Sequence, residues 1–407
     1  MTQPETEAGR EMRVLEINLG YSSWYWVHRP DQPEKLHFGL HRGLLLLGDE
    51  KKKCVGVDLT DRAAFEWISK ASARRRAAVR TAKIGAQEDL DVIKLLPNLD
   101  SLECSGLSEE ELQWICGLDM PLRCLYLSWC HNLSDLEPVR KMTSLIRLSI
   151  SDCPELKNVE AVADLKELKR LDIINCDNLW EVDAAAYATR LRRVVLRNCE
   201  NINKLGPLAM LPDLRHLDLS RCTHVKDLSP MRKSSKLLLL DLSNCLRVSD
   251  VSPLQDLNSL RVLRLFGCNS LHDLRPLYQL PQLRKISLPN NITDGDFLGL
   301  CIGFDGLQQL DLRNCDNVSN IEPIERLKTL RKLSLAGCRN IEDISALAVL
   351  EKLVQLDLAY CTKISDLSPL HGLKNLKHLY VDGCAKVDRE EIAALKEALP
   401  HCNVHDT

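Results

Sequence analysis

The sequence predicts an α/β solenoid, a chain of stacked repeats that each hold one short strand and one tight return segment. Cysteines recur at an almost constant interval of 23 residues, leucines alternate just before each cysteine, and a proline follows in most copies. A period of roughly 20–50 residues indicates stacked repeats that share one continuous core. We call the cysteine position the rung, and it is occupied by Cys130, Cys153, Cys176, Cys199, Cys222, Cys245, Cys268, Cys315, Cys338, Cys361 and Cys384.

The residues before and after each rung predict the two parts of a repeat. Before it runs Leu-x-x-Leu-x-Leu-x-x-Cys, as in Leu214, Leu217, Leu219 and Cys222. Residues two apart in a strand share a face, so this alternation predicts a strand with buried leucines. After it, apolar residues recur about every third position and a Pro-Leu step follows, as at Pro253. That spacing and the proline favour a 3₁₀ or irregular return over a long α-helix.

Over residues 76–385, about 13 such copies closely resemble the leucine-rich repeat family, whose pattern accepts Asn or Cys at the rung. The resemblance implies a right-handed α/β solenoid with parallel strands on its concave face. The 23-residue variety with Cys-x-x-Ile-x-Asp-Leu-x-Pro-Leu, as at Cys361, is most similar to intracellular leucine-rich-repeat proteins of trypanosomes and their relatives. One of those resembles an adenylate-cyclase regulator with a cysteine-rich zinc finger. This chain has only Cys54 before residue 104, so that activity is not carried over.

The rung has a structural interpretation and a chemical one. The chain leaves the strand there, and buried backbone groups need partners, which an Asn amide or a weakly donating thiol supplies. Metal or redox chemistry is the alternative, but neighbouring rungs have no Cys-x-x-Cys spacing and no interleaved histidines. We therefore expect structural thiols and no metal or other cofactor.

Composition limits the compartment and the partners. The 407 residues are 45% hydrophobic, enough for a large elongated core, and the net charge of −3 exerts no general pull on nucleic acid. Seventeen cysteines, mostly regular buried singles, indicate a reducing compartment. A polar, acidic start and the lack of a long apolar run argue against secretion, mitochondrial import and membrane insertion. We expect a cytoplasmic protein, with nuclear and flagellar locations left open.

The two ends depart from the repeat. Residues 1–75 predict an α+β N-terminal capping domain, with strands over 12–19 and 23–27 and a helix that begins after Asp61. Alternatively these residues form a recruiting module in which Trp24 and Trp26 anchor a partner. Residues 386–407 predict a C-terminal capping helix and a mobile tail with incidental histidines and a cysteine.

The outward positions of each strand lie two, four and six residues before the rung, and a solenoid of this kind binds its partners there. Acidic and basic residues at these positions can pair across strands, which is a purely structural use. Apolar residues beside arginines are typical of protein-binding hot spots. They form one main patch and an aromatic patch towards each end. The candidate protein-binding residues are Val195, Arg193, Arg197, Leu238, Leu239, Val262, Arg264, Phe266, Tyr126, Trp129, Tyr360 and Tyr380.

One repeat, residues 289–306, is irregular. Asn291 takes the rung, the Pro-Leu step is missing, one residue is added, and four glycines follow from Gly295 to Gly306. This repeat either bends the solenoid, presents a loop at the binding surface, or has simply drifted.

The sequence contains no nucleotide-binding loop, metalloprotease helix or nucleophile elbow. His216, Asp218 and Ser220 would lie side by side along one strand, too far apart for a catalytic triad. We expect a non-enzymatic scaffold or adaptor that binds a protein within a larger complex on its concave face, with no small-molecule substrate. The alternatives are a specificity or regulatory subunit of a ubiquitin ligase, phosphatase or cyclase, and an RNA-associated subunit that uses a basic column beginning at Arg147 and Arg170. Acidic neighbours and the net charge argue against nucleic acid.

Overall fold

The chain forms two compact units, residues 1–104 and 105–407. The computed structural model describes the backbone of residues 13–19, 22–28, 38–41, 44–47 and 53–55, and both backbone and side chains of residues 56–85, 90–118 and 120–406.

The first unit combines strands with short helices. Its elements are β1 (Arg13–Leu19), β2 (Ser22–His28), β3 (Phe38–His41), β4 (Leu44–Leu47), β5 (Lys53–Asp58), α1 (Arg62–Lys70), α2 (Ala73–Arg76), β6 (Thr81–Gly85), the 3₁₀ helix η1 (Leu90–Leu95) and β7 (Ser101–Ser105), whose last residue opens the second unit. β1 pairs antiparallel with β2, β4 pairs antiparallel with β3 and β5, and β5 runs parallel to β6. The Asp61 side chain accepts a hydrogen bond from Ala63 N at 2.8 Å and caps α1 as predicted. The side chains of Trp24 and Trp26 lie outside the described residues.

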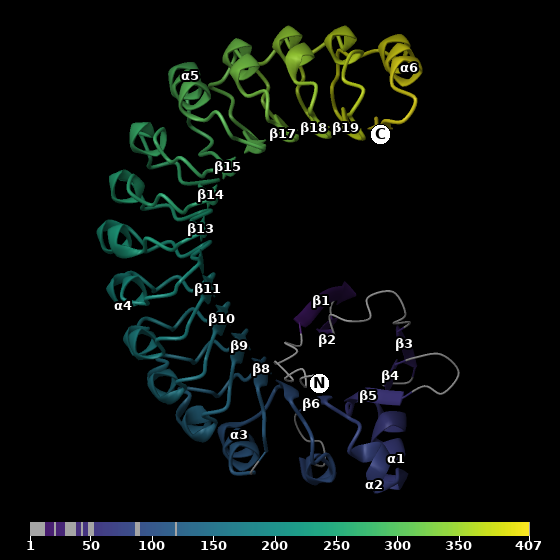
Figure 1. The fold of residues 1–407 in the computed structure, drawn as a ribbon, viewed down its shortest axis with the longest axis vertical. Coiled ribbons are helices and arrows are strands. Elements are labelled where there is room, and N and C mark those ends of the chain that lie inside the picture. Colours follow the sequence, from purple (N-terminus) through teal and green to yellow (C-terminus); the bar gives the residue numbers. More distant parts are fainter. Residues whose placement is uncertain are drawn as a thin grey trace, which may run out of the picture. The chain divides into compact units, whose positions relative to one another are not determined.

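The second unit is a solenoid of parallel strands. They are β8 (Cys124–Ser128), β9 (Arg147–Ser151), β10 (Arg170–Ile174), β11 (Arg193–Arg197), β12 (His216–Asp218), β13 (Leu239–Asp241), β14 (Val262–Arg264), β15 (Lys285–Ser287), β16 (Gln309–Asp311), β17 (Lys332–Ser334), β18 (Gln355–Asp357), β19 (His378–Tyr380) and β20 (Asn403–His405). Each pairs in register with the next along the chain. Within this unit the strands line the inner side of an open arc and the return segments lie outside (Figure 1). The predicted α/β solenoid is confirmed.

The return segments are mostly 3₁₀ helices, as the apolar spacing predicts. They are α3 (Glu109–Cys116), η2 (Glu137–Lys141), η3 (Glu160–Asp164), η4 (Asp183–Tyr187), α4 (Gly206–Ala209), η5 (Ser229–Lys233), η6 (Ser252–Leu254), η7 (Arg275–Leu277), α5 (Asp294–Gly303), η8 (Glu322–Arg326), η9 (Ser345–Val349) and η10 (Ser368–Leu370), and α6 (Arg389–Ala398) follows the last rung. In several of them a proline fills one of the first two positions, where its missing N–H costs nothing.

The rung thiols hydrogen-bond to backbone carbonyls. From Cys199 onward each rung Sγ lies near a carbonyl oxygen 26 residues earlier, at or just after the end of the strand of the preceding repeat. Cys222 donates to Leu196 O at 2.7 Å and Cys245 donates to Leu219 O at 3.1 Å. At the rung without cysteine, Asn291 Nδ2 donates to Asn269 O and Leu271 O, both at 3.0 Å. The rungs therefore supply donors to buried carbonyls, which is the structural interpretation.

The residue just before each rung cysteine turns the chain out of the strand with a positive φ. Asn244 has φ 60° and Gly267 has φ 74°. Asn tolerates this region better than other side chains, and Gly adopts it without steric cost. At residue 267 a Cβ would also lie 2.3 Å from Asn244 Oδ1. Glycine is therefore favoured there by φ and by the close contact with the Asn244 side chain.

The irregular repeat contains the helix α5, whose glycines serve packing. A Cβ on Gly299 would lie 2.4 Å from Cε2 of Tyr278, and one on Gly303 would lie 2.6 Å from Tyr278 O. The Tyr278 hydroxyl donates to Asp296 O at 3.3 Å. The added residue and the glycines thus allow a longer helix to sit against the preceding return segment.

The C-terminal tail is not the mobile segment that we predicted. Residues 403–405 form β20, which adds to β19, and His405 stacks on Tyr380 with ring centres 4.3 Å apart and planes 7° apart. Without the tail, β19 would be an edge strand with unpaired backbone groups, and these groups pair with the tail. The sequence pattern of the tail alone did not indicate this pairing.

Candidate functional site

The concave face is a grid with three outward columns, which we name after their distance from the rung. The minus-six column begins each strand, as at Val262, the minus-four column holds Arg264, and the minus-two column holds Phe266. Because neighbouring strands pair in register, residues of one column lie about 4.8 Å apart at their backbones. A substitution at any outward position therefore acts on a small, defined neighbourhood.

The minus-four column is more covered than predicted. Val195 retains only 3% of its exposure and Tyr126 only 7%, so neither is an open anchor on this surface. Asp172, Asp218 and Asp241 are also buried. Long side chains of the flanking columns contact several of these residues, since Arg147 hydrogen-bonds to Tyr126, Arg170 is ion-paired with Asp172, and Arg197 is ion-paired with Asp218. The prediction of exposure was wrong at these positions.

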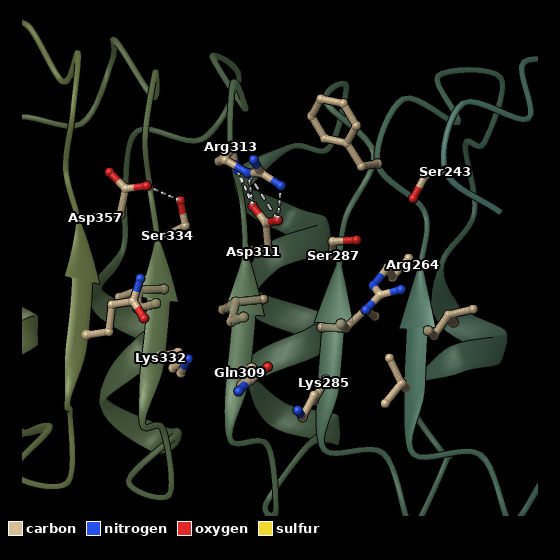
Figure 2. A pocket seen from close by; sticks show the side chains of 17 residues that line it. Ser243, Arg264, Lys285, Ser287, Gln309, Asp311, Arg313, Lys332, Ser334 and Asp357 are labelled. Carbon is tan, nitrogen blue, oxygen red and sulfur yellow. Dashed lines mark hydrogen bonds and ion pairs between the residues drawn. The ribbon is translucent and has the colours of Figure 1, made fainter. Parts of the chain in front are cut away.

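The concave face is hollowed over β14–β18 (Figure 2). The hollow has a volume of about 420 Å³ and is lined by Ser243, Val262, Leu263, Arg264, Phe266, Lys285, Ile286, Ser287, Gln309, Leu310, Asp311, Arg313, Lys332, Leu333, Ser334, Gln355 and Asp357. A neighbouring hollow of about 320 Å³ shares Arg313 and is otherwise lined by Asn314, Ala336, Gly337, Arg339, Tyr360 and Thr362. The two together form the candidate binding site.

Within the larger hollow, several polar side chains hold one another in place. Arg313 binds Asp311 in a fork, with Nε to Oδ1 at 2.9 Å and Nη2 to Oδ2 at 2.7 Å (Figure 2). Ser334 Oγ donates to Asp357 Oδ2 at 3.1 Å (Figure 2). Arg264 Nη1 donates to Oδ2 of Asp241, outside the lining, at 2.9 Å. The hydrogen bonds with Asp311 raise the pKa of Arg313 further above its ordinary value. The Arg264–Asp241 pair joins two strands, as the structural use of the columns predicts.

Two lysines in the hollow are not held by an ion pair with a described carboxylate. Lys285 and Lys332 are exposed, and among the residues that the structure describes neither has a carboxylate within 4.0 Å. Gln309 lies between them in the minus-six column and offers both a donor and an acceptor. With the half-buried Phe266 and Val262, the hollow combines apolar surface, free cations and amides, a combination suited to a peptide.

The main predicted patch is only partly assembled. Val262, Arg264 and Phe266 line the hollow, and Leu239 pairs in register with Val262 on the adjacent strand. Leu238 stands half-buried just before β13. Arg193 and Arg197 lie on β11, three strands from β14, and the Arg197 Nη2 donates to Asp218 Oδ2 at 2.6 Å. They belong to another part of the face.

The two aromatic patches differ from the prediction as well. Trp129 is 55% exposed and contacts the His131 ring edge-on at 6.2 Å, whereas the buried Tyr126 accepts a hydrogen bond from Arg147 Nη1 at 3.1 Å. Tyr360 lines the smaller hollow, while Tyr380 stacks on His405. Among the described residues no ring contact joins Tyr360 to Tyr380.

Sequence reasoning missed Arg313, which connects the two hollows. The signal was available, since most residues in the minus-two column are small, as at Ser243 and Ala336, and Arg313 is one of a few large exceptions with Ile174, Arg197 and Phe266. The guanidinium carbon of Arg313 lies 5.5 Å from the centre of the Phe266 ring.

Two features bear on other classes of function. Within residues 56–85, 90–118 and 120–406, no cluster of three or more His, Cys, Asp or Glu side chains is arranged to hold a metal ion. No helix in the described part of the chain has the length and apolarity needed to span a membrane.

Comparison with known proteins agrees with this architecture. The family model described as Leucine Rich repeats (2 copies) matches residues 189–233 and 305–349. An internalin from Listeria monocytogenes has 20% sequence identity and a TM-score of 0.57, over 84% of this chain and 92% of that one. A leucine-rich-repeat protein from Leptospira interrogans has 18% identity and a TM-score of 0.48, over 84% and 97% of the two chains. No curated protein matches the sequence. The chain therefore has the leucine-rich-repeat fold, and its two matched segments are leucine-rich repeats.

Proposed function

We propose that this chain is a non-enzymatic scaffold or adaptor that binds a protein partner on its concave face. The observation that carries the proposal is the hollow over β14–β18, where Val262 and Phe266 lie among Arg264, Lys285 and Lys332. Aromatic and arginine side chains in a partly covered hollow are typical of the residues that contribute most to protein association. The role of leucine-rich repeats as interaction modules supports it.

The proposal also covers the two terminal segments of the chain and its cellular compartment. Residues 1–75 and 386–407 act as caps, which a solenoid needs to keep its terminal repeats from water. The rung thiols donate hydrogen bonds to backbone carbonyls, a role that requires them reduced and so supports a cytoplasmic location. The cysteine rung with its Asp-Leu and Pro-Leu steps, seen at Cys361, supports kinship with the trypanosome proteins of this variety.

Affinity purification of the full chain followed by mass spectrometry tests the proposal. The double variant Leu239→Glu with Phe266→Glu places one carboxylate at the edge of the hollow and one inside it. We expect this variant to abolish recovery of the partner. The matched control is Leu298→Glu with Ile302→Glu, two exposed apolar residues of α5 on the outer side of the arc. Thermal unfolding followed by circular dichroism establishes that both variants fold.

The identity of the recovered protein distinguishes a scaffold from a regulatory subunit of an enzyme. A ubiquitin ligase, phosphatase or cyclase among the recovered proteins supports a regulatory subunit, whereas a non-catalytic assembly supports a scaffold. Equal recovery by the hollow variant and the wild type contradicts the proposed site.

A further inference from the structure

Lysines and glutamines alternate in one row of the concave face. Lys285, Gln309, Lys332 and Gln355 occupy the minus-six column of β15, β16, β17 and β18, and these strands pair in register. All four line the larger hollow at the end where the strands begin, and Figure 2 shows the first three in a row there. We call these four residues the lysine–glutamine row. Its lysines are exposed and its glutamines are half-buried.

Positive charge gathers at the end of the hollow where the strands begin. Over β14–β18, the minus-six column and the column just before it contain no acidic residue. Their cations are Arg261, Arg284, Lys285, Arg331 and Lys332. In the part of the chain that the structure describes, none of these five has a carboxylate within 4.0 Å. Cations without a counter-ion attract an anionic ligand to this end of the hollow.

The acidic side chains of the hollow lie in the next column along the strands and are held there. Asp311 binds the guanidinium of Arg313 in a fork. Asp357 accepts hydrogen bonds from Ser334 Oγ at 3.1 Å and from Ala359 N at 3.2 Å. The minus-four column is two residues further along each strand, about 6.6 Å from the lysine–glutamine row. An acidic ligand is therefore favoured over the row and disfavoured beyond it.

The spacing of the two lysines selects one backbone conformation of such a ligand. Lys285 and Lys332 lie two strands apart, which is about 9.6 Å at their backbones. A polyproline II helix has three residues per turn and rises about 3.1 Å per residue, so side chains three apart share one face at about 9.3 Å. In a β-strand, side chains three apart point to opposite faces. Acidic residues at every third position of a polyproline II segment therefore match the two lysines.

The two glutamines suit the backbone of a polyproline II segment. Such a segment has no internal hydrogen bonds, so its N–H and C=O groups need outside partners. Within the described residues, the side-chain amides of Gln309 and Gln355 make no hydrogen bond, and each amide can both donate and accept. An α-helical ligand bonds its own backbone and would leave these amides unused. The strands of the row cannot pair with a ligand backbone, because each is already paired on both sides.

We propose that the lysine–glutamine row binds an acidic polyproline II segment of the partner protein, with glutamate or aspartate at every third position. Two of its carboxylates lie on Lys285 and Lys332, and the amides of Gln309 and Gln355 bond its backbone. The arginines of the adjoining column add attraction at longer range. This role rests on the proposed function and gives the chemistry of the partner.

A peptide fits this end of the hollow better than a nucleic acid does. Single strands of RNA or DNA are held on open aromatic rings against which the bases stack. Phe266 is the aromatic side chain among the lining residues, and it is half-buried with the guanidinium carbon of Arg313 5.5 Å from its ring centre. A nucleic acid also carries a charge on every nucleotide and cannot match charges to the lysines alone.

The binding probe is a fluorescent peptide with four repeats of Pro-Pro-Glu, titrated with the full chain and followed by anisotropy. The matched peptide has the same composition but carries its glutamates at every second position, so that no two stand three residues apart. We expect the first peptide to bind more tightly by roughly tenfold, because only its glutamates reach both lysines from one face. Equal affinity for the two peptides would overturn the polyproline II register.

Two variants of the protein test the row itself. Lys285→Gln with Lys332→Gln should weaken binding of the Pro-Pro-Glu peptide by roughly tenfold, since it removes both cations. Lys285→Gln with Gln309→Lys keeps the net charge and moves one cation by one strand, so it should weaken binding as well. Unchanged binding by this charge-conserving variant would show that the position of the lysines is irrelevant and would overturn the inference. Added salt should weaken wild-type binding by screening the charges.

The matched control is Arg232→Gln with Lys233→Gln in η5, two exposed cations on a return segment. Equal weakening by this control and by Lys285→Gln with Lys332→Gln would show that only net charge matters and would overturn the inference. Tighter binding of an oligouridylate with the same number of charges would overturn it in favour of RNA. Thermal unfolding followed by circular dichroism establishes that the variants fold.

Recovery of the partner from cells distinguishes failure of the row from failure of the proposed function. If Lys285→Gln with Lys332→Gln still recovers the partner but Leu239→Glu with Phe266→Glu does not, the row is wrong while the proposed function stands. If both variants recover it as the wild type does, the proposed site is contradicted as well.

Discussion

Arg313 lies with its guanidinium carbon 5.5 Å from the centre of the Phe266 ring, although β15 separates the strands that precede the two residues. Asp311 holds the other side of the same guanidinium in its fork. A planar cation held between a carboxylate and an aromatic face has little rotational freedom. This arrangement fixes the boundary between the two hollows before any partner arrives.

The Phe266–Arg313 contact should be measurable as a coupling energy. A double-mutant cycle of Phe266→Ala and Arg313→Ala, followed by chemical denaturation, should give about 0.5–1 kcal/mol of stabilising coupling, the range of an exposed cation–π pair. Arg339→Ala is the control, because Arg339 lines the smaller hollow without a cation–π contact to the ring. An equal coupling for Arg339 would contradict the contact.

The packing of Tyr278 against α5 predicts opposite effects for two glycines of one helix. Gly299→Ala should lower the free energy of unfolding by about 1–3 kcal/mol, because its Cβ would lie 2.4 Å from the Tyr278 ring. Gly295→Ala should be neutral or stabilising by up to about 1 kcal/mol, since its nearest atom is 3.7 Å away and alanine favours helix.

A second substitution isolates the cause. Tyr278→Ala should relieve much of the Gly299→Ala defect, because the ring is what the new methyl group meets. It should not relieve Gly303→Ala, whose closest atom is the Tyr278 backbone oxygen at 2.6 Å. Rescue of both variants, or of neither, would show that the contacts have been misassigned.

The rung thiols predict a loss of stability at alkaline pH. Burial raises the pKa of Cys222 and Cys268 from an ordinary 9.0 to about 12. A group with a raised pKa in the folded state contributes stability that is full below its unfolded pKa and is lost as the pH rises towards the folded value. Stability should therefore fall between pH 9 and about 12. A Cys222→Ala, Cys268→Ala variant, less stable at neutral pH, should show a shallower alkaline slope in urea unfolding; an unchanged slope would assign the loss to other groups.

Asp218 predicts a loss of folding stability at acidic pH. Burial alone would raise its pKa, but hydrogen bonds from Ser220 and Arg197 outweigh burial and lower it below the ordinary 3.8. Its contribution is present above pH 3.8 and is lost as the pH falls through the folded pKa. Asp218→Asn should cost about 2–3 kcal/mol at neutral pH by leaving Arg197 and Ser220 poorly paired. Asp305→Asn, at an exposed site, should cost almost nothing in the same denaturation assay.

The sequence predicted the strands and the return segments because both follow from local periodicity. The alternation that ends at Cys222 defines a strand, and Asp61 defines a helix start, without knowledge of any neighbour. The side-chain environment on the concave face depends instead on residues a whole repeat away. Val195 fits the pattern of an exposed position, yet it is almost fully buried.

The same reasoning explains why the hollow and the packing of α5 in the irregular repeat were not foreseen. Arg313 acquires its role from Phe266, two repeats earlier, and Gly299 acquires its role from Tyr278 on the preceding return segment. Neither partner is marked by the spacing of the repeat. That the candidate residues bind a protein partner remains a prediction.

The hydrogen bonds from the rung thiols connect neighbouring repeats, and this determines how the chain can gain or lose repeats. Each thiol from Cys199 onward approaches a carbonyl 26 residues back, and each strand pairs with its immediate predecessor, so these bonds cross a single repeat boundary. Deleting or duplicating a regular 23-residue unit would join a donor to an equivalent acceptor at the new junction. Such a chain can gain or lose strands of its concave face in whole steps during evolution, while each repeat boundary keeps its thiol-to-carbonyl bond.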